Sequence, residues 1–350
     1  MRTLKDLNLE NKRVLVRCDF NVPLSERGEI LNDFRIEETI PTIRYLIEKR
    51  AKIILMSHLG RPEGKVVEKL RLTPIQDRLM EYLDLSIVKA ADCIGPDIEK
   101  LTREMQPGEI LLLENLRFHK EEEENDENFA GELAKLGDIY INDAFSLCHR
   151  NHASVVGITK YLPSGAGLLL EKEIGVLSQI IKNPKRPLVV IIGGSKFKDK
   201  AKVVEKFSEI ADFLLLGNLV ADEFKENKIK IKYPEKIVFP AEDKNSPDMS
   251  EETIRNFKGK ILKAKTIFWA GPLGKIEEEE FSKGTEEIAK AIIESGAFSV
   301  VGGGETVEFI NKLGLSGKFS HLSIGGGAML EFLAGEKLPG LVALNFYEGN

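Results

Sequence analysis

The sequence predicts an α/β protein built from two units, each a parallel sheet covered by helices, with a linking helix between them. Short, continuously apolar segments alternate with longer segments whose apolar residues recur at helical spacing, a pattern typical of sheets buried on both faces. The alternation stops near residues 161–187 and then resumes, and 350 residues is the length of about two domains.

Ten segments have the composition of buried strands. In the first half we expect strands at 13–17, 52–56, 110–113 and 138–141, with helices at 35–49 and 73–83 between them. In the second half the expected strands are 188–192, 213–216, 236–239, 266–269, 298–301 and 322–324. The acidic run 121–124 is expected to be a solvated loop or the start of a helix.

The boundary between the units is expected around a helix. The segment PSGAG at 163–167 interrupts the chain, residues 168–181 have a strong helical pattern, and Pro184 and Pro187 end it. We therefore predict a first domain at 1–165, a linking helix within 166–186, and a second domain at 187–335.

Composition excludes several classes of protein. The chain has 50 Lys and Arg against 56 Asp and Glu, a net charge of −6, so no global basic field would attract nucleic acid. Its apolar runs are far shorter than the ~18 residues of a membrane-spanning helix, and its first residues lack an apolar signal core. Three scattered cysteines do not make a disulfide framework. We expect a cytoplasmic protein.

Glycine clusters follow the predicted strands of the second half. They are Gly193-Gly194, 302–304 and 325–327, each followed by a helical pattern, and the related segment 269–274. Glycine lets backbone N–H groups approach an anion closely, and a helix N-terminus adds partial positive charge. One such loop is equally well a tight turn, but three in one sheet indicate a ligand rich in phosphate.

Charged residues stand beside these clusters. Lys196 and Lys200 follow Gly194 and share one helix face, well placed for phosphate oxygens, although Lys198 and Lys202 also fit a solvated lysine face. Glu305 opens the helix after 302–304, either as a partner of the helix dipole or as a Mg²⁺ ligand.

Arginine and histidine follow the strands of the first half. Four loops deliver these groups to one sheet edge, which indicates a pocket for a small ligand with several negative charges. The residues are Asp19 and Asn21 after the first strand, His58 and Arg61 after the second, Arg117 after the third, and His149, Arg150 and His152 after the fourth, with Arg35 opening the first helix. Cys148, His149 and His152 lack a fourth ligand in sequence, so zinc is not expected there.

An anion pocket in one unit and a phosphate cradle in the other indicate phosphoryl transfer between two ligands, which needs positioning and charge neutralisation more than a nucleophile. The spacings match neither a Walker A loop nor G-x-G-x-x-G, which excludes a standard nicotinamide dehydrogenase.

Seven motifs in order resemble the phosphoglycerate kinase family. They are VRCDFNVP at 16–23, SHLGRP at 57–62, ENLRF at 114–118, GGSK at 193–196, WAGPLG at 269–274, VGGGET at 301–306 and GGGA at 325–328. The resemblance covers nearly the whole chain. It implies two Rossmann-like domains joined by a hinge helix, with segment 336–350 returning to the first, and a monomer. It also implies reversible phosphoryl transfer from 1,3-bisphosphoglycerate to Mg-ADP, giving 3-phosphoglycerate and ATP in glycolysis, with hinge closure over the ligands.

The resemblance also implies roles for individual residues. Those that would hold 3-phosphoglycerate are Asp19, Phe20, Asn21, Arg35, His58, Leu59, Gly60, Arg61, Arg117 and Arg150. The moving phosphoryl group would be stabilised by Arg35, Lys196, Lys200 and the backbone of Gly325, Gly326 and Gly327. The nucleotide would be bound by Lys200, Glu277 at the ribose, Gly303, Gly304, Glu305 and Thr306, with Glu305 at the Mg²⁺ that accompanies the nucleotide phosphates.

The chain departs from the family pattern mainly on the nucleotide side. Glu305 replaces the usual Asp, Ala270 an Asn and Ile324 a Thr; 146–148 replace a Gly-Thr-Ala stretch, and 224–236 is shorter than usual. These departures keep open an alternative, a relative that binds phosphoglycerate or nucleotide but is impaired in transfer.

Overall fold

The structure, a computed structural model, describes residues 1–195, 197–227, 231–241 and 246–348. The chain forms two compact units, Met1–Lys172 with Lys337–Asn350, and Glu173–Glu336. The division falls inside α6 (Leu168–Lys182), so the helix expected as a separate linker contributes residues to both units.

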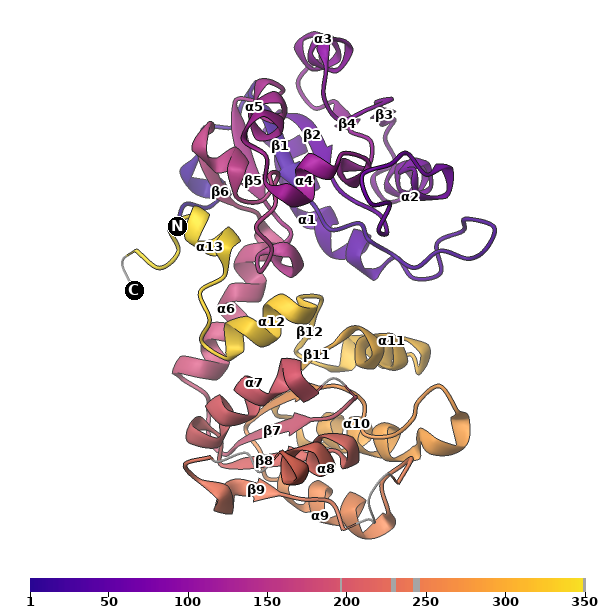
Figure 1. The fold of residues 1–350 in the computed structure, drawn as a ribbon, viewed down its shortest axis with the longest axis vertical. Helices are drawn as coiled ribbons and strands as arrows, with labels where there is room; N and C mark the ends of the chain where they lie inside the picture. Colours follow the sequence, from indigo (N-terminus) through magenta and orange to yellow (C-terminus); the bar gives the residue numbers. More distant parts are fainter. Residues whose placement is uncertain (196, 228–230, 242–245, 349–350) are drawn as a thin grey trace. The chain divides into compact units, whose positions relative to one another are not determined.

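The first unit contains a parallel sheet of strand order β3-β4-β2-β1-β5-β6. Its strands are β1 (Arg13–Arg17), β2 (Lys52–Met56), β3 (Val88–Lys89), β4 (Ile110–Leu112), β5 (Ile139–Asn142) and β6 (Ser164–Ala166). Its helices are α1 (Phe34–Glu48), α2 (Thr73–Leu83), α3 (Pro96–Glu104), α4 (Lys120–Glu124), α5 (Glu127–Lys135), the start of α6, and α13 (Pro339–Ala343). Figure 1 shows the helices of this unit flanking its strands.

Both faces of this sheet are buried, which explains the continuous apolar runs of its strands. In β1, Val14 and Val16 pack in a core with residues of α1 and α2, whereas Leu15 packs in a second core with residues of α3 and α5. Since successive side chains of a strand point to opposite faces, a strand covered on both sides has no polar position in its interior.

The second unit repeats this architecture with the strand order β12-β11-β10-β7-β8-β9, again entirely parallel. Its strands are β7 (Leu188–Ile192), β8 (Phe213–Leu216), β9 (Ile237–Val238), β10 (Thr266–Ala270), β11 (Phe298–Gly302) and β12 (His321–Ser323). Its helices are α7 (Phe197–Ile210), α8 (Asn218–Glu226), α9 (Glu251–Ile261), α10 (Lys283–Ser295), α11 (Gly304–Lys312) and α12 (Gly326–Leu333). The predicted α/β class with two parallel sheets is confirmed.

Two edge strands lie where no strand was predicted. β3 has only two residues, too few for an apolar pattern, and β6 occupies the segment expected to interrupt the chain. The small residues of β6 allow a close approach, since a Cβ on Gly165 would lie 3.0 Å from Leu7 Cδ1 and the neighbouring Ala166 bridges to Thr3.

The C-terminal segment belongs to the first unit. The N–H of Gly340, in α13, donates to the carbonyl of Cys148 at 2.8 Å, and the hydroxyl of Tyr347 accepts from the N–H of Leu338 at 3.1 Å. The first bond attaches the chain end to the loop that follows β5, and the second holds the C-terminal segment together.

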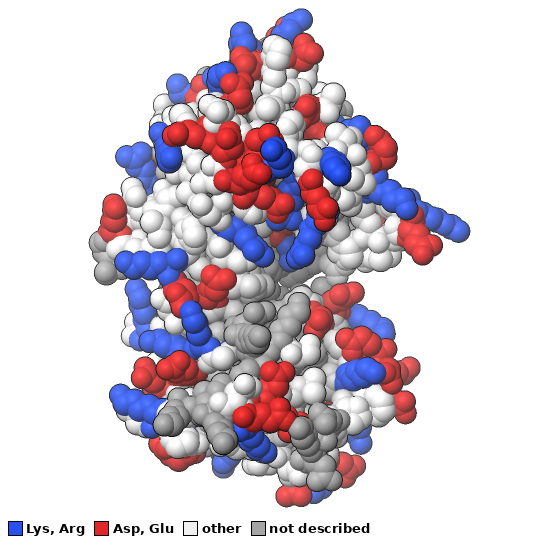
Figure 2. All heavy atoms as spheres, in the orientation of Figure 1, with Lys and Arg blue, Asp and Glu red and all other residues white. Residues whose placement is uncertain are grey.

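On the face shown in Figure 2, acidic and basic side chains of the described residues are interspersed, in keeping with the near balance of charges in the sequence. In the described ranges, no helix combines the length and apolar character required to cross a membrane.

Candidate active site

The carboxyl ends of three neighbouring strands lie level in the first sheet. Arg17, the last residue of β1, pairs with Met56 at the end of β2 on one side and with Asn142 at the end of β5 on the other. The loops that follow these strands therefore start at the same height, which brings their polar side chains to one edge of the sheet.

Hydrogen bonds connect these loops. The Oδ1 atom of Asn21 accepts from the N–H of Gly60 at 2.8 Å, and the N–H of Phe20 donates to Ser57 Oγ at 2.9 Å. Arg117, which follows β4, donates from Nη1 to the carbonyl of Gly60 at 3.0 Å. Three of the predicted site residues, Asn21, Gly60 and Arg117, thus belong to one bonded arrangement.

A buried carboxylate holds Arg35 at this edge. Asp19 forms an ion pair with Arg35, and its carboxylate also accepts from Ser146 Oγ and from the N–H of Asn21 at 3.1 Å. Burial alone would raise the pKa of Asp19, but Arg35, His58 and these hydrogen bonds lower it to about 2. Ser146, one of the departures from the family pattern, is therefore part of the support for Arg35.

The histidines of this edge are held neutral. Burial, together with the charges of Arg17, Arg117 and Arg35, keeps the pKa of His58 well below its ordinary value. Burial and the neighbouring arginines likewise lower the pKa of His149 to about 4 and that of His152 to about 3. The positive charge near neutral pH therefore comes from the arginines, while His58 offers a neutral imidazole.

The arginines differ in accessibility. Arg61 and Arg150 are exposed, and neither lies within salt-bridge distance of a carboxylate in the described part of the chain. Arg35 has 31% of its side chain exposed, and Arg117 is mostly buried beside Glu123 at 3.2 Å. Phe20 and Leu59 are buried in the apolar core, so their side chains stabilise the loops.

A buried ionic network lies behind this edge and corrects one prediction. The run 121–124, expected to be a solvated loop or the start of a helix, lies in the helix α4, but Glu122 within it is fully buried. Its carboxylate accepts from Ser154 Oγ at 2.5 Å and from the Ser154 N–H at 2.9 Å, and lies 3.6 Å from the buried Arg17. Glu122 can be buried because Arg17 compensates its charge and Ser154 donates two hydrogen bonds to it, and both partners are distant in sequence.

In the second sheet the glycine clusters also start level. Ala270, at the end of β10, pairs with Ile192 of β7 and Gly302 of β11, and Gly302 pairs with Ser323 of β12. The four predicted glycine-containing loops therefore emerge from one edge of this sheet, as expected for loops that act on one ligand.

Two of these loops need glycine for packing against each other. A Cβ on Gly193 would lie 2.2 Å from the carbonyl oxygen of Pro272, and one on Gly271 would lie 2.1 Å from that of Gly193. The N–H of Gly194 donates to Pro272 O at 2.7 Å. Here the glycines allow backbone to touch backbone.

One glycine in each of the other two clusters faces open space, although Gly302 does not, since a Cβ there would lie 2.2 Å from Met329 Sδ. A Cβ on Gly304 or on Gly326 would meet no atom within 4 Å. Gly304 is the first residue of α11 and Gly326 the first of α12, so at each of these helix N-termini free backbone N–H groups lie beside an open position. This arrangement suits an anion such as a nucleotide phosphate.

A cavity of about 500 Å³ opens among these loops. Its lining includes two predicted nucleotide residues, Glu277 and the exposed Glu305. The remaining lining residues are Gly194, Ser195, Asn218, Leu219, Ser246, Pro247, Pro272, Leu273, Gly274 and Lys275. The two carboxylates therefore share one cavity with the first glycine loop.

Asn218 was not predicted as a site residue. It begins α8 directly after Gly217 and holds the cavity wall, since its Nδ2 donates to the carbonyls of Asp248 at 2.9 Å and Ser246 at 3.2 Å. The signal in the sequence was a further glycine between a strand and a helix.

The structure describes only one of the two lysines that were predicted to contact phosphate. Lys196 lies outside the described residues. Lys200 is buried, and its ammonium group donates to the carbonyl of Gly193, which directs it to the first glycine loop. Carboxylate oxygens are the ligands Mg²⁺ prefers, so the exposed Glu305 in the cavity fits a magnesium–nucleotide complex.

The fold and these two strand edges define a two-unit α/β protein with arginine and histidine side chains at the edge of one parallel sheet and glycine loops around a cavity at the edge of the other. A family model, Phosphoglycerate kinase, matches residues 4–232 and 218–336. The chain therefore belongs to the phosphoglycerate kinase family.

Known phosphoglycerate kinases are similar to this chain over nearly its whole length. The chain is 43% identical to a phosphoglycerate kinase of Moorella thermoacetica, with 98% of each chain covered, and 44% identical to one of Chlorobium phaeobacteroides, with 98% of this chain and 99% of the other covered. The first alignment runs over 387 positions, more than the 350 residues of this chain, so that relative has residues that this chain lacks.

Solved structures show the same fold. Phosphoglycerate kinase from Pyrococcus horikoshii OT3 superposes with a TM-score of 0.89 at 34% identity, covering 100% of both chains. The enzyme from Coxiella burnetii gives a TM-score of 0.83 at 33% identity and covers 99% of both.

Proposed function

We propose that this chain catalyses the reversible transfer of the acyl phosphate of 1,3-bisphosphoglycerate to Mg-ADP, which gives 3-phosphoglycerate and ATP in glycolysis. The observation that carries the proposal is the pairing of two sites in one chain. One is an edge where exposed arginines meet neutral histidines. The other is a cavity lined by the first glycine loop and by Glu305 in the first turn of α11, at the sheet edge from which the loop before α12 also starts. The family membership and the named relatives support the same reaction.

In this proposal the first unit binds phosphoglycerate. The exposed Arg61 and Arg150, with Arg117, pair with the 3-phosphate and carboxylate, because guanidinium groups make paired hydrogen bonds to such anions. Neutral His58 donates or accepts a hydrogen bond without adding charge. Asn21 and Asp19 position the loop and Arg35.

The second unit binds the nucleotide. The N-termini of α11 and α12, at Gly304 and Gly326, direct backbone N–H groups to the phosphates. Glu277 accepts from the ribose hydroxyls, and Glu305 would stand at the magnesium ion, which would be held mainly by the nucleotide phosphates. The ion neutralises phosphate charge when it is bound.

Transfer itself depends on stabilising the moving phosphoryl group. Arg35, Lys196, Lys200 and the backbone of Gly325, Gly326 and Gly327 supply this positive charge and these donors. The carboxylate of 3-phosphoglycerate attacks the γ-phosphorus of ATP in one direction, and ADP leaves. Closure of the two units about α6 on binding both ligands would exclude water. In this proposal the protein acts as a monomer in the cytoplasm.

A coupled assay tests the proposal. Formation of 1,3-bisphosphoglycerate from 3-phosphoglycerate and Mg-ATP is followed as NADH oxidation by glyceraldehyde-3-phosphate dehydrogenase, and turnover of at least ~1 s⁻¹ is expected. Arg35→Ala should abolish most of it. The control Arg103→Ala removes an exposed arginine of α3 whose carboxylate partner is Glu99, one turn away, and should leave turnover unchanged.

No turnover with ATP or GTP in a folded protein that binds 3-phosphoglycerate would overturn the proposal and favour the impaired relative. The departures at Ala270, Ile324 and Glu305 would then be the first positions to restore to the family's usual residues.

A further inference from the structure

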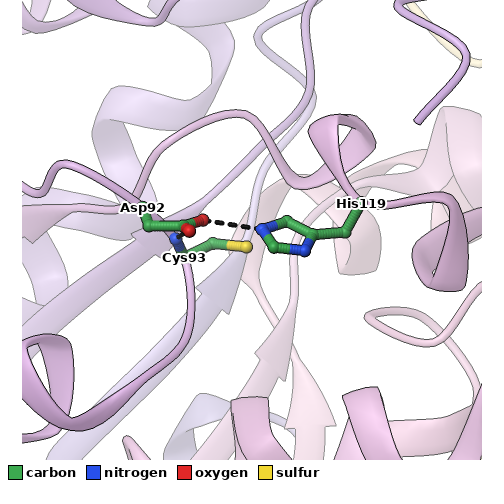
Figure 3. Close-up of side chains that lie close together, drawn as sticks. All are labelled: Asp92, Cys93 and His119. Atoms are coloured by element: carbon green, nitrogen blue, oxygen red, sulfur yellow. Dashed lines mark hydrogen bonds and ion pairs between the residues drawn. The ribbon is translucent and has the colours of Figure 1, made fainter. Parts of the chain in front are cut away.

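Three potential metal ligands converge where the loop after β3 meets the end of the segment that carries Arg117. Asp92 and Cys93 follow the edge strand β3, and His119 follows the short helical turn Leu116–Phe118. Figure 3 shows the three side chains pointing toward one another from these two segments. One oxygen, one sulfur and one nitrogen atom of the group all lie within 4.8 Å of one another.

The group is open on one side and buried on the other. The side chain of Asp92 is 52% exposed and that of His119 is 25% exposed, whereas Cys93 is fully buried. An ion would therefore meet the carboxylate and imidazole at the surface and the sulfur beneath them.

Local contacts fix these side chains before any ligand arrives. Asp92 Oδ1 accepts from the N–H of Cys93 at 2.7 Å and from His119 Nε2 at 2.7 Å. The ring of His119 packs against Phe129, with centroids 5.3 Å apart. The contacts of His119 with Phe129 and of Asp92 with the Cys93 N–H do not need to break when an ion binds, so these side chains lose little further freedom.

The combination of donors selects a class of cation. Magnesium and calcium prefer oxygen ligands throughout, whereas thiolate and imidazole together suit zinc and similar ions. Three protein ligands with water as the fourth is a known zinc arrangement. We propose that Asp92, Cys93 and His119 form a binding site for a thiophilic divalent cation of the zinc class.

Binding of the ion requires a small rearrangement of the three side chains and the loss of protons from them. Ligand atoms of a tetrahedral zinc ion lie about 3.3–3.8 Å apart, given bonds near 2.0–2.3 Å. The Cys93 sulfur must therefore approach, and the hydrogen bond between Asp92 and His119 must open. The thiol proton passes to solvent as sulfur binds the ion. His119 binds through Nε2 as a neutral imidazole with its proton on Nδ1, so a protonated His119 releases its Nε2 proton to solvent, whereas a neutral one only transfers it to Nδ1.

The competing reading is a simple ion pair. The hydrogen bond to Asp92 raises the pKa of His119, as an exposed Asp–His pair would, and Cys93 packs in the apolar core with its neighbours. An ion pair between Asp92 and His119 does not involve the Cys93 sulfur, however, whereas the metal site does. An experiment that detects the sulfur as a ligand therefore distinguishes the two hypotheses.

Cobalt is the probe because thiolate ligation to Co²⁺ gives a charge-transfer absorption. Chelator-treated full-length protein titrated with Co²⁺ should show this band saturating at one equivalent, and Zn²⁺ should displace it. Cys93→Ser should remove the band. Asp92→Asn and His119→Gln should weaken Co²⁺ binding by about 100-fold or more, since even an outer partner of a ligand is worth 10- to 100-fold.

Cys148→Ser, which removes another buried free cysteine, is the matched control and should keep the band. The absence of a thiolate band at equimolar Co²⁺, or an unchanged band in Cys93→Ser, overturns the proposal. If Cys93→Ser fails to fold, Asp92→Asn decides, because the exposed Asp92 tolerates the change: unchanged Co²⁺ affinity in that variant also overturns it. The test is independent of the phosphotransfer activity.

Discussion

Glu173 in α6 accepts a hydrogen bond at Oε1 from the backbone N–H of Ile324, at 2.9 Å. Its other oxygen accepts from Ser323 Oγ at 2.8 Å, and His321 Nε2 lies 3.3 Å from it. Ile324 directly precedes Gly325–Gly327, so one buried carboxylate fixes the start of the glycine loop expected at the moving phosphoryl group. Because Ile324 contributes its backbone here, the replacement of Thr leaves this bond intact.

A second carboxylate, in the first unit, bonds to the same helix, α6. Asp143, directly after β5, accepts from the N–H groups of Leu169 at 2.9 Å and Leu170 at 3.3 Å, in the first turn of α6. The helix is thus bonded to a strand-edge loop in each unit, at Asp143 in the first and through Glu173 in the second.

Replacing Glu173 tests its positioning role. Glu173→Ala leaves the Ile324 N–H and Ser323 hydroxyl without their acceptor, which should lower the free energy of unfolding by about 1–3 kcal/mol. Glu173→Gln keeps one acceptor and should lose less. Denaturant unfolding with a kcat measurement checks this: a purely structural role would leave the kcat of the folded Gln variant unchanged, whereas loop positioning predicts a lower kcat.

Asp143 predicts a pH dependence of stability. Burial, with Glu38 nearby, raises the pKa of Asp143 to about 7 despite the N–H groups it accepts. Between about pH 4 and pH 7 the unfolded carboxyl is ionised and the folded one is protonated. Unfolding then releases a proton, so this residue makes stability fall as pH rises through that range, by on the order of 4 kcal/mol.

The variant Asp143→Asn carries no titrating group but keeps an oxygen for the Leu169 N–H. Its free energy of unfolding, relative to wild type, should increase steadily from pH 4 to pH 7 and level off above it. Two parallel curves, measured by urea unfolding at each pH, would show that Asp143 does not titrate in this way.

Much of this architecture follows from short-range patterns. Strands β1, β2, β7 and β10 were predictable because both sheet faces are covered, which leaves only apolar residues in them. The edge strands β3 and β6 were not, since β3 is an exposed Val88 beside a partly buried Lys89 and β6 consists of the small residues Ser164, Gly165 and Ala166, which have no strand-like apolar pattern.

The site was predictable in outline for a related reason. Polar residues directly after parallel strands must meet at one sheet edge, and the level ends of β1, β2 and β5 show that they do. The burial of Glu122 was hidden because its partners Arg17 and Ser154 are far away in sequence. Taken without these partners, four consecutive glutamates predict a solvated surface.

Lys200 and Lys202 make a matched pair on α7. Lys200 is buried with its ammonium group at Gly193, whereas Lys202 is 71% exposed and pairs with Glu336 at 2.6 Å. Lys200→Ala should lower kcat by roughly 10²–10³, the effect of losing one preorganised donor to a transition state. Lys202→Ala should leave kcat within a factor of two, since an exposed ion pair contributes little. Equal losses in the two variants would contradict the assignment.

Replacing Gly304 tests whether this glycine is needed for nucleotide binding but not for stability. Its Cβ would meet no atom within 4 Å, and Gly304 is not in the left-handed region, so Gly304→Ala should not reduce stability. The added methyl group would, however, occupy the space into which α11 directs its N–H groups, and should raise the KM for ATP at least about tenfold, which corresponds to about 1.4 kcal/mol of binding. Gly259→Ala in α9 is the control, because its Cβ also meets nothing and it should gain about 0.5–1 kcal/mol of stability with an unchanged KM. An unchanged KM for ATP in a stable Gly304→Ala protein would mean that the phosphates lie elsewhere.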